Sequence, residues 1–103
     1  MIYRAWDPLS GRPDGRDVAG IPAPSVGKEI TPDLVLAPCV GWSASGHRLG
    51  YGGGWYDRWH EKHPTIRIVG VVSESSRIEG LEFESFDLVL DAVVTPRGRV
   101  RYF

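Results

Sequence analysis

The sequence predicts one α/β domain, and three stretches carry that prediction. Residues 33–38 form a continuous apolar run of the kind found in buried strands. Residues 66–72 are a second predicted buried strand, because five of the seven residues are Ile or Val. Between them, a glycine-rich loop leads into residues 55–63, a run without glycine or proline that we expect to be a helix. A strand, a helix and a second strand in this order are typical of an α/β sheet.

Composition limits the classes of protein to which the chain can belong. A length of 103 residues allows at most one domain with a modest core. A net charge of −1 and a hydrophobic fraction of 42% are typical of a soluble globular protein and argue against a nucleic-acid partner. Cys39 is the only cysteine, so an internal disulfide cannot form and a cytoplasmic location is expected. We expect neither a membrane span nor a signal peptide, because the sequence shows no long apolar run and no basic-then-apolar leader.

The first 33 residues are predicted to form an edge strand and a long irregular loop. Residues 2–6 alternate apolar and polar side chains, as a short strand does. Residues 7–33 contain five prolines and four glycines, too many for a regular element. A loop of this length is functional, disordered or the remnant of a larger structure.

Residues 34–58 place a glycine loop beyond the carboxyl end of a strand. Pro38 ends the first apolar run, and residues 41–47 are predicted to be a loop that leads to the glycines. Ligands of α/β sheets bind beyond the carboxyl ends of strands. The glycine loop is therefore the candidate binding site.

The stretch Arg48–Arg58 has the composition of an anion-binding loop. Four glycines within five positions let a ligand approach the main chain closely. A loop that opens a helix directs unpaired N–H groups and the positive end of the helix dipole at a phosphate. The guanidinium of Arg48 can donate two parallel hydrogen bonds to the same anion, and Asp57 in the first helical turn can hold Mg²⁺.

Other interpretations of the glycine stretch are a turn with solvated or capping charges, or a known nucleotide motif. A P-loop does not fit, because no Lys-Ser or Lys-Thr pair follows the glycines. The dinucleotide fingerprint fails too, because its last glycine would fall on Trp55. The phosphate-binding loop is favoured over the bare turn on composition.

The last third of the chain adds strands but no further helix. Residues 86–94 are a third predicted strand, and Thr95-Pro96-Arg97-Gly98 has a type I turn signature that lets 99–103 pair back as a hairpin. Four or five strands and one helix leave one apolar face of the sheet uncovered. We therefore expect self-association, or a covering segment that this chain lacks.

Two further carboxylates are candidates for a metal site with Asp57. Asp87 and Asp91 are four residues apart and would lie about 13 Å apart on one strand, too far to share an ion. At most one of them can join Asp57. An exposed or turn carboxylate is an equally good explanation for either.

Three other features have simpler explanations. His60 and His63 could form half of a metal site, but histidines at a helix C-terminus are the better account. Cys39 is expected to be a small buried side chain rather than a nucleophile. Of Trp42, Trp55 and Tyr56, which could stack on a flat ring, only Trp55 is favoured as a ligand contact, because it adjoins the glycines.

Several segments resemble the carboxyl-terminal half of the 5-formyltetrahydrofolate cyclo-ligases, also called methenyltetrahydrofolate synthetases. The segments are 32–38, Gly46-His47-Arg48-Leu49-Gly50-Tyr51-Gly52-Gly53-Gly54-Trp55-Tyr56-Asp57-Arg58, Asp87-Leu88-Val89-Leu90-Asp91 and, before them, Gly20-Ile21-Pro22-Ala23-Pro24. The arginine, the glycines, the aromatic pair and the aspartate form a specific signature. Trp55 stands where the family usually has tyrosine.

The resemblance implies a three-layer α/β/α, Rossmann-like mixed sheet, of which this chain contains the carboxyl-terminal half. It also implies the ATP- and Mg-dependent cyclisation of 5-formyltetrahydrofolate to 5,10-methenyltetrahydrofolate. ATP phosphorylates the formyl oxygen, the folate N10 attacks the activated carbon and phosphate leaves. Such a reaction requires mainly positioning and charge neutralisation.

The resemblance also assigns site residues by position. The ATP-binding residues would be Arg48, Leu49, Gly50, Tyr51, Gly52, Gly53, Gly54, Trp55 and Tyr56, with Arg48 also catalytic. The folate would contact Tyr51, Gly52, Gly53, Gly54 and Trp55, and Mg²⁺ would be held by Asp57 and Asp87.

Two functions remain open for a chain that matches only half of such an enzyme. Family members are nearly twice as long, and their amino-terminal half supplies basic residues for ATP and contacts for folate. The first is that of an enzyme of the family, or of the nucleotide-binding half of one. The second is that of a non-catalytic nucleotide- or folate-binding module. A single-stranded nucleic-acid binder is a third hypothesis, against which the net charge argues.

Overall fold

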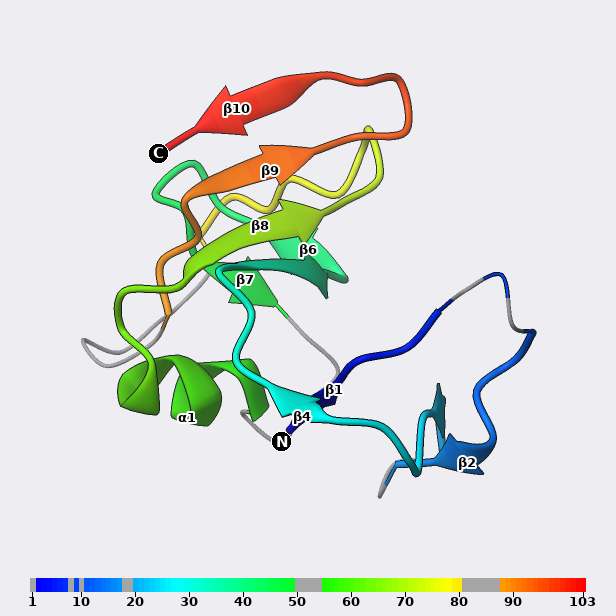
Figure 1. Ribbon diagram of the computed structural model, residues 1–103. Coiled ribbons are helices and arrows are strands. Elements are labelled where there is room, and N and C mark those ends of the chain that lie inside the picture. Colours follow the sequence, from blue (N-terminus) through cyan, green and yellow to red (C-terminus); the bar gives the residue numbers. More distant parts are fainter. Residues whose placement is uncertain (1, 8, 10, 18–19, 50–54, 81–87) are drawn as a thin grey trace. The chain divides into compact units, whose positions relative to one another are not determined.

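The main feature of the structure is a four-stranded mixed sheet (Figure 1). The computed structural model describes residues 2–7, 9, 11–17, 20–49, 55–80 and 88–103, which group into the units 1–32 and 33–103. The sheet belongs to the second unit and has the order β10-β9-β8-β5. Its strands are β5 (Leu34–Pro38), β8 (Arg67–Val71), β9 (Ala92–Val94) and β10 (Val100–Tyr102). The first three are parallel and β10 is antiparallel to β9, which confirms the α/β class with a mixed sheet.

The helix α1 (Trp55–Lys62) connects β5 to β8. It ends one residue before the predicted limit, ahead of Pro64, which cannot continue a helix. The Nδ1 atom of His63 lies 2.9 Å from the carbonyl oxygen of Trp59, and the two rings stack with centroids 4.3 Å apart. His63 therefore has the helix C-terminal role expected of it. In the described part of the chain, no helix is long and apolar enough to cross a membrane.

A short hairpin precedes the helix, where a loop was predicted over residues 41–47. Its strands are β6 (Gly41–Trp42) and β7 (Arg48–Leu49), paired antiparallel. The turn closes through hydrogen bonds from Ser43 N to His47 O and from Gly46 N to Ser43 O, and Gly46 has a φ of 89°. The loop prediction is wrong for Gly41 and Trp42, because a turn with positive φ lets two very short strands pair, and it is confirmed for residues 43–46.

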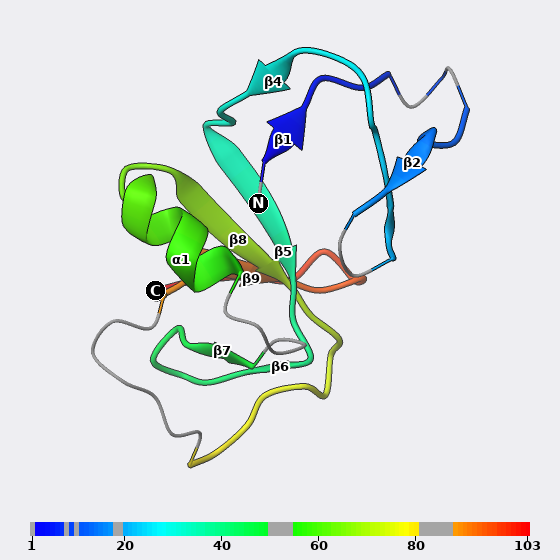
Figure 2. The same ribbon diagram turned by 90° about the horizontal axis from the view of Figure 1, so that it is seen from below.

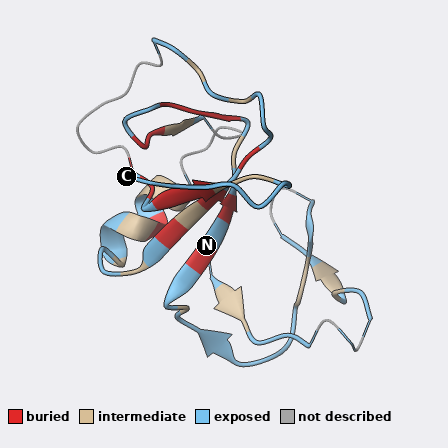
Figure 3. Ribbon diagram, turned by 90° about the horizontal axis from the view of Figure 1, so that it is seen from above, coloured by how far each residue is buried: buried red, intermediate tan, exposed pale blue. Residues whose placement is uncertain are grey.

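One face of the sheet is packed and the other is open. Figure 2 shows α1 and the β6–β7 hairpin on the same side of the sheet, and the side chains of β5 alternate accordingly (Figure 3). Val35, Ala37 and Ile68 are at most 4% exposed, whereas Leu34 and Leu36 are 51% and 61% exposed. The prediction that residues 33–38 are buried on both faces is therefore wrong.

The exposed side chains of the sheet gather on one face, which we call the open face. Strand register places the residues of the open face in neighbouring rows across the sheet. Its large exposed members are Leu34, Leu36, Val71, Val100 and Tyr102. The expected imbalance between one helix and a largely apolar sheet is thus present in the described residues.

The β9–β10 hairpin follows the predicted turn. Gly98 N donates to Thr95 O at 2.9 Å, and Gly98 has a φ of 76°. The preceding strand is shorter than the predicted 86–94, because only Ala92–Val94 pair with β8. At Asp91 the side-chain Oδ2 accepts a 2.7 Å hydrogen bond from Ile68 N, so a carboxylate takes the place of a strand carbonyl.

The unit 1–32 contains two pairs of two-residue strands. β1 (Tyr3–Arg4) pairs with β4 (Glu29–Ile30), and β2 (Gly15–Arg16) pairs with β3 (Pro22–Ala23). The expected edge strand over 2–6 is therefore present as β1, but the prediction of no regular element in 7–33 is wrong. Aspartate side chains support the β2–β3 pair, as in the 2.9 Å hydrogen bond from Ser25 N to Asp14 Oδ1. The single domain expected for 1–103 stays a prediction.

Candidate functional site

Arg48 lies at the carboxyl end of β5, where the sequence analysis placed the candidate site. Its Nη2 donates a 2.7 Å hydrogen bond to the carbonyl oxygen of Pro38, the last residue of β5. Its Nε lies 3.4 Å from the Sγ of Cys39. Its guanidinium carbon lies 4.9 Å from the ring centroid of Tyr56 in the first turn of α1. The guanidinium is thus held by the strand end, the residue after it and the helix.

Tyr56 is half-buried beneath this guanidinium. Burial raises the pKa of its hydroxyl above 10.0, and the positive charge of Arg48 opposes that rise. The phenol therefore stays neutral near pH 7. Its ring offers Arg48 the face that attracts cations.

Trp55 and Arg58, in the same helical turn, are more exposed than Tyr56. The Trp55 side chain is 43% exposed, and the guanidinium carbon of Arg58 lies 4.9 Å from its ring centroid. Asp57 also lies in this turn, where a carboxylate is favoured by the helix dipole. The turn presents an aromatic ring, a cation and an anion within four residues.

Asp57 is tied to a distant part of the chain. Its Oδ1 accepts a 2.9 Å hydrogen bond from the backbone N–H of Leu88. Leu88 directly follows Asp87, the second predicted magnesium ligand. The first turn of α1 and the backbone next to Asp87 are therefore in contact.

Six of the predicted site residues lie outside the described residues: Gly50, Tyr51, Gly52, Gly53, Gly54 and Asp87. The structure describes Arg48 and Leu49 on one side of the glycines and Trp55, Tyr56 and Asp57 on the other. Of these, Arg48 and Tyr56 are in contact, and Leu49 is 42% exposed. Among the described residues, no group of three His, Cys, Asp or Glu side chains could hold a metal ion.

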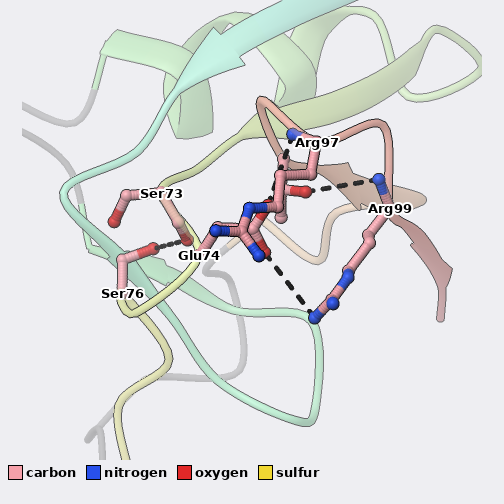
Figure 4. Close-up of polar contacts among 6 residues, drawn as sticks. Ser73, Glu74, Ser76, Arg97 and Arg99 are labelled. Atoms are coloured by element: carbon pink, nitrogen blue, oxygen red, sulfur yellow. Dashed lines mark hydrogen bonds and ion pairs between the residues drawn. The ribbon is translucent and has the colours of Figure 1, made fainter.

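Two loops at the same edge of the sheet are joined by Glu74 (Figure 4). Glu74 follows β8, and its Oε1 accepts a 3.3 Å hydrogen bond from the backbone N–H of Arg97 in the β9–β10 turn. Its Oε2 lies 3.9 Å from the Nη1 of Arg99. Ser76 Oγ donates to Ser73 O in the same loop. These contacts fix the chain at the carboxyl ends of β8 and β9, on the edge of the sheet where β5 ends.

Comparison with known proteins identifies the family. The sequence model of the 5-formyltetrahydrofolate cyclo-ligase family matches residues 17–96. The chain belongs to this family. The 5-formyltetrahydrofolate cyclo-ligase of Escherichia coli (strain K12) is 39% identical over 66 residues, and that of Mycolicibacterium smegmatis is 32% identical over 78 residues. The family match thus includes the candidate site and the three parallel strands β5, β8 and β9.

Solved structures of the family share the fold. The NMR structure of Aquifex aeolicus 5,10-methenyltetrahydrofolate synthetase matches 85% of this chain with a TM-score of 0.67 and 33% identity. The synthetase from Mycoplasma pneumoniae matches 65% of the chain with a TM-score of 0.57 and 27% identity. The α/β fold with a central mixed sheet is thereby confirmed as that of the methenyltetrahydrofolate synthetases.

The chain spans less than half the length of these relatives. It covers 36% of the E. coli cyclo-ligase, 39% of the M. smegmatis cyclo-ligase and 46% of the Aquifex synthetase. The activity of a complete cyclo-ligase is therefore a proposal for this chain.

Sequence reasoning missed the surroundings of Arg48. Cys39 was expected to be a small buried side chain, but it is half-buried with its Sγ beside the Nε of Arg48. The carbonyl of Pro38 was not considered at all. Neither contact has a sequence signal, because a hairpin of two-residue strands brings Arg48 back to the end of β5. The only hint was that both residues flank the predicted loop.

Proposed function

We propose that this chain carries out, or supplies the nucleotide-binding half for, the ATP- and Mg-dependent cyclisation of 5-formyltetrahydrofolate to 5,10-methenyltetrahydrofolate. Membership of the cyclo-ligase family supports the reaction class. The placement of Arg48 at the carboxyl end of β5, next to the start of α1, is the observation that carries the proposal. This edge of an α/β sheet is where phosphate ligands bind.

The described residues fit an anion beside a hard cation. Arg48 uses two of its five N–H groups on Pro38 and Cys39, and the other three make no hydrogen bond to the described residues. The Oδ2 of Asp57 likewise accepts no hydrogen bond from the described residues, although Oδ1 does. In the proposal, Arg48 binds ATP phosphates and Asp57 holds Mg²⁺ together with Asp87. A bound Mg²⁺ would neutralise phosphate charge during transfer.

The roles of the remaining site residues follow from the proposed phosphoryl transfer. Residues 49–55 would line the ATP phosphates, 51–55 would also approach the folate, and Tyr56 would complete the ATP site beside Arg48. The exposed ring of Trp55 is suited to stack on a flat heterocycle. Arg48 would stabilise the charge that develops as the formyl oxygen takes the γ-phosphoryl group, before N10 attacks the activated carbon and phosphate leaves. A cytoplasmic setting is part of this proposal and is supported by the single cysteine.

A non-catalytic module is the second candidate function. One observation favours it: the chain covers only 36% to 46% of the length of its relatives. Such a module would bind nucleotide or folate without turnover.

Two measurements on the 103-residue chain distinguish the two candidate functions. Calorimetric titration with MgATP is expected to show binding that Arg48→Ala weakens and that Arg12→Ala, at an exposed arginine of the unit 1–32, does not. An absorbance assay for 5,10-methenyltetrahydrofolate then shows whether ATP-dependent product forms. Binding without product supports the module. No nucleotide binding at about millimolar concentration contradicts the first candidate and leaves only a folate-binding module.

We also propose that the open face is covered in solution, with a second copy of the chain as the occupant. Its five large side chains are 42% to 80% exposed, and water solvates their apolar surface poorly. In the described sheet, β5 is an end strand, and its free edge adjoins the open face. A segment of a longer chain is the other occupant that the sequence suggests, and the oligomeric state of the 103-residue chain distinguishes the two.

A further inference from the structure

The contacts of Arg48 divide its guanidinium into a held edge and a free edge. The Nε–H and one Nη2–H lie on one edge of a guanidinium, and these are the donors to Cys39 Sγ and Pro38 O. The two terminal nitrogens form the other edge, where one N–H of Nη1 and the second N–H of Nη2 make no hydrogen bond to the described residues. That free edge has the spacing that binds a phosphate with two parallel hydrogen bonds.

The plane of the guanidinium is also fixed. Its central carbon lies 4.9 Å from the ring centroid of Tyr56, whose position is set by the first turn of α1. An arginine side chain has large rotamer freedom, so an unsupported Arg48 would lose entropy each time it bound an anion. Two in-plane contacts and one face contact remove that freedom before a ligand arrives.

We propose that Cys39 and Tyr56 are positioning residues, which together with the Pro38 carbonyl hold Arg48 so that its free edge faces a phosphate of ATP. The inference rests on the proposed function, because it takes the phosphate as the ligand of Arg48. It assigns Cys39 a role on Arg48 instead of a purely apolar one. It makes Tyr56 act on the phosphate through Arg48.

The first test needs no nucleotide. In an NMR spectrum of the ¹⁵N-labelled chain, the Arg48 Nε–H is expected to exchange with water at least about tenfold more slowly than that of Arg99, whose side chain is 74% exposed. Cys39→Ala and Tyr56→Leu should each remove most of this protection. Tyr56→Phe keeps the aromatic face and should retain it. An Arg48 Nε–H that exchanges as fast as that of Arg99 in the unmodified chain overturns the proposal.

The second test measures MgATP affinity in a double-mutant cycle. Tyr56→Leu is expected to weaken binding about three- to tenfold and Cys39→Ala about threefold, with Tyr56→Phe within about twofold of the unmodified chain. In an Arg48→Ala background, Tyr56→Leu should cause less than about a twofold further loss. An equal loss in both backgrounds means that Tyr56 acts on ATP without Arg48, which overturns the proposal.

The two tests separate failure of this inference from failure of the proposed function. A protected Nε–H together with MgATP binding that does not respond to Arg48→Ala contradicts the phosphate role of Arg48 and leaves its anchoring intact. An unprotected Nε–H together with MgATP binding that Arg48→Ala weakens supports the proposed function and overturns the positioning. Thermal unfolding of every variant by circular dichroism identifies any change that acts by unfolding the chain.

Discussion

The Oδ1 of Asp57 accepts a 2.9 Å hydrogen bond from the backbone N–H of Leu88, across 31 positions of sequence. Asp57 lies in the first turn of α1, and Leu88 follows Asp87 directly. One carboxylate oxygen therefore ties the helix to the backbone beside the second predicted magnesium ligand. The contact supports the proposed pairing of Asp57 with Asp87, which spacing alone could not select.

Substitutions at Asp57 should separate its structural contact from its charge. Asp57→Asn keeps a carbonyl oxygen for the Leu88 N–H, so the free energy of unfolding should change by less than about 0.5 kcal/mol. Asp57→Ala leaves that N–H without its partner and should cost about 1–2 kcal/mol in urea unfolding. Both should weaken Mg²⁺-dependent ATP binding by at least about tenfold.

Glu61→Gln is the matched control for the Asp57 variants, because Glu61 is an exposed carboxylate on the same helix. It should leave both stability and ATP binding unchanged. Nucleotide binding by Asp57→Asn equal to that of the unmodified chain would refute the metal role of Asp57.

Stability above pH 10 should depend on Tyr56. Its pKa is raised above 10.0 by burial, so the protonated phenol is favoured in the folded chain relative to the unfolded chain. The contribution of Tyr56 to the free energy of unfolding is fully present below pH 10.0. It is lost as the pH rises through the higher pKa that Tyr56 has in the folded chain. Urea unfolding between about pH 8 and 11 should show this loss in the unmodified chain and less of it in Tyr56→Phe. Identical pH profiles for the two chains would contradict the assignment.

A charge on the open face should abolish self-association. Leu36 is 61% exposed at the centre of β5, so Leu36→Lys places an ammonium group inside the proposed interface between copies. Light scattering at micromolar concentration should show an oligomer for the unmodified chain and a monomer for Leu36→Lys. Leu9→Lys is the control, because Leu9 is 94% exposed in the unit 1–32 and should leave the oligomer intact. A monomeric unmodified chain would rule out the second copy as the covering partner.

A methyl group at Gly70 should disturb the packed face beside the site. A Cβ there would lie 2.9 Å from Leu90 Cδ1, 3.0 Å from Cys39 Sγ and 3.2 Å from Val93 Cγ1. Because Leu90 is 1% exposed and cannot move into solvent, Gly70→Ala should cost about 1–3 kcal/mol of unfolding free energy. The double variant Gly70→Ala/Leu90→Val should cost less than the sum of the two single changes in urea unfolding. Additive costs would show that Leu90 does not clash with the new methyl group.

Local signals explain which elements the sequence predicted well. The end of α1 follows from Pro64, and the turn at Thr95–Gly98 follows from a proline and a glycine at defined positions. Strand β8 lies within the apolar run 66–72. Each of these depends on residues that are close together in the sequence, so a pattern is sufficient to find them.

Elements that depend on a single turn or a single side chain were predicted poorly. The β6–β7 hairpin needs the positive φ of Gly46, and β9 begins only after the side chain of Asp91 has bonded to Ile68 N. Two-residue strands contain too few residues to show any alternation. Their pairing is decided by hydrogen bonds between chain segments rather than by a local preference.

The sequence alone determined the α/β class, the helix after the glycine loop and the excess of apolar sheet surface, while the anion-binding loop within Arg48–Arg58 stays a prediction. These follow from periodicity, glycine content and charge, which are properties of neighbouring residues. Only the tertiary structure decided that Arg48 is held by Pro38, Cys39 and Tyr56, and that Asp57 contacts the backbone at Leu88. Such contacts join segments that are 8 to 31 positions apart, and their partners are selected by how the strands and the helix pack.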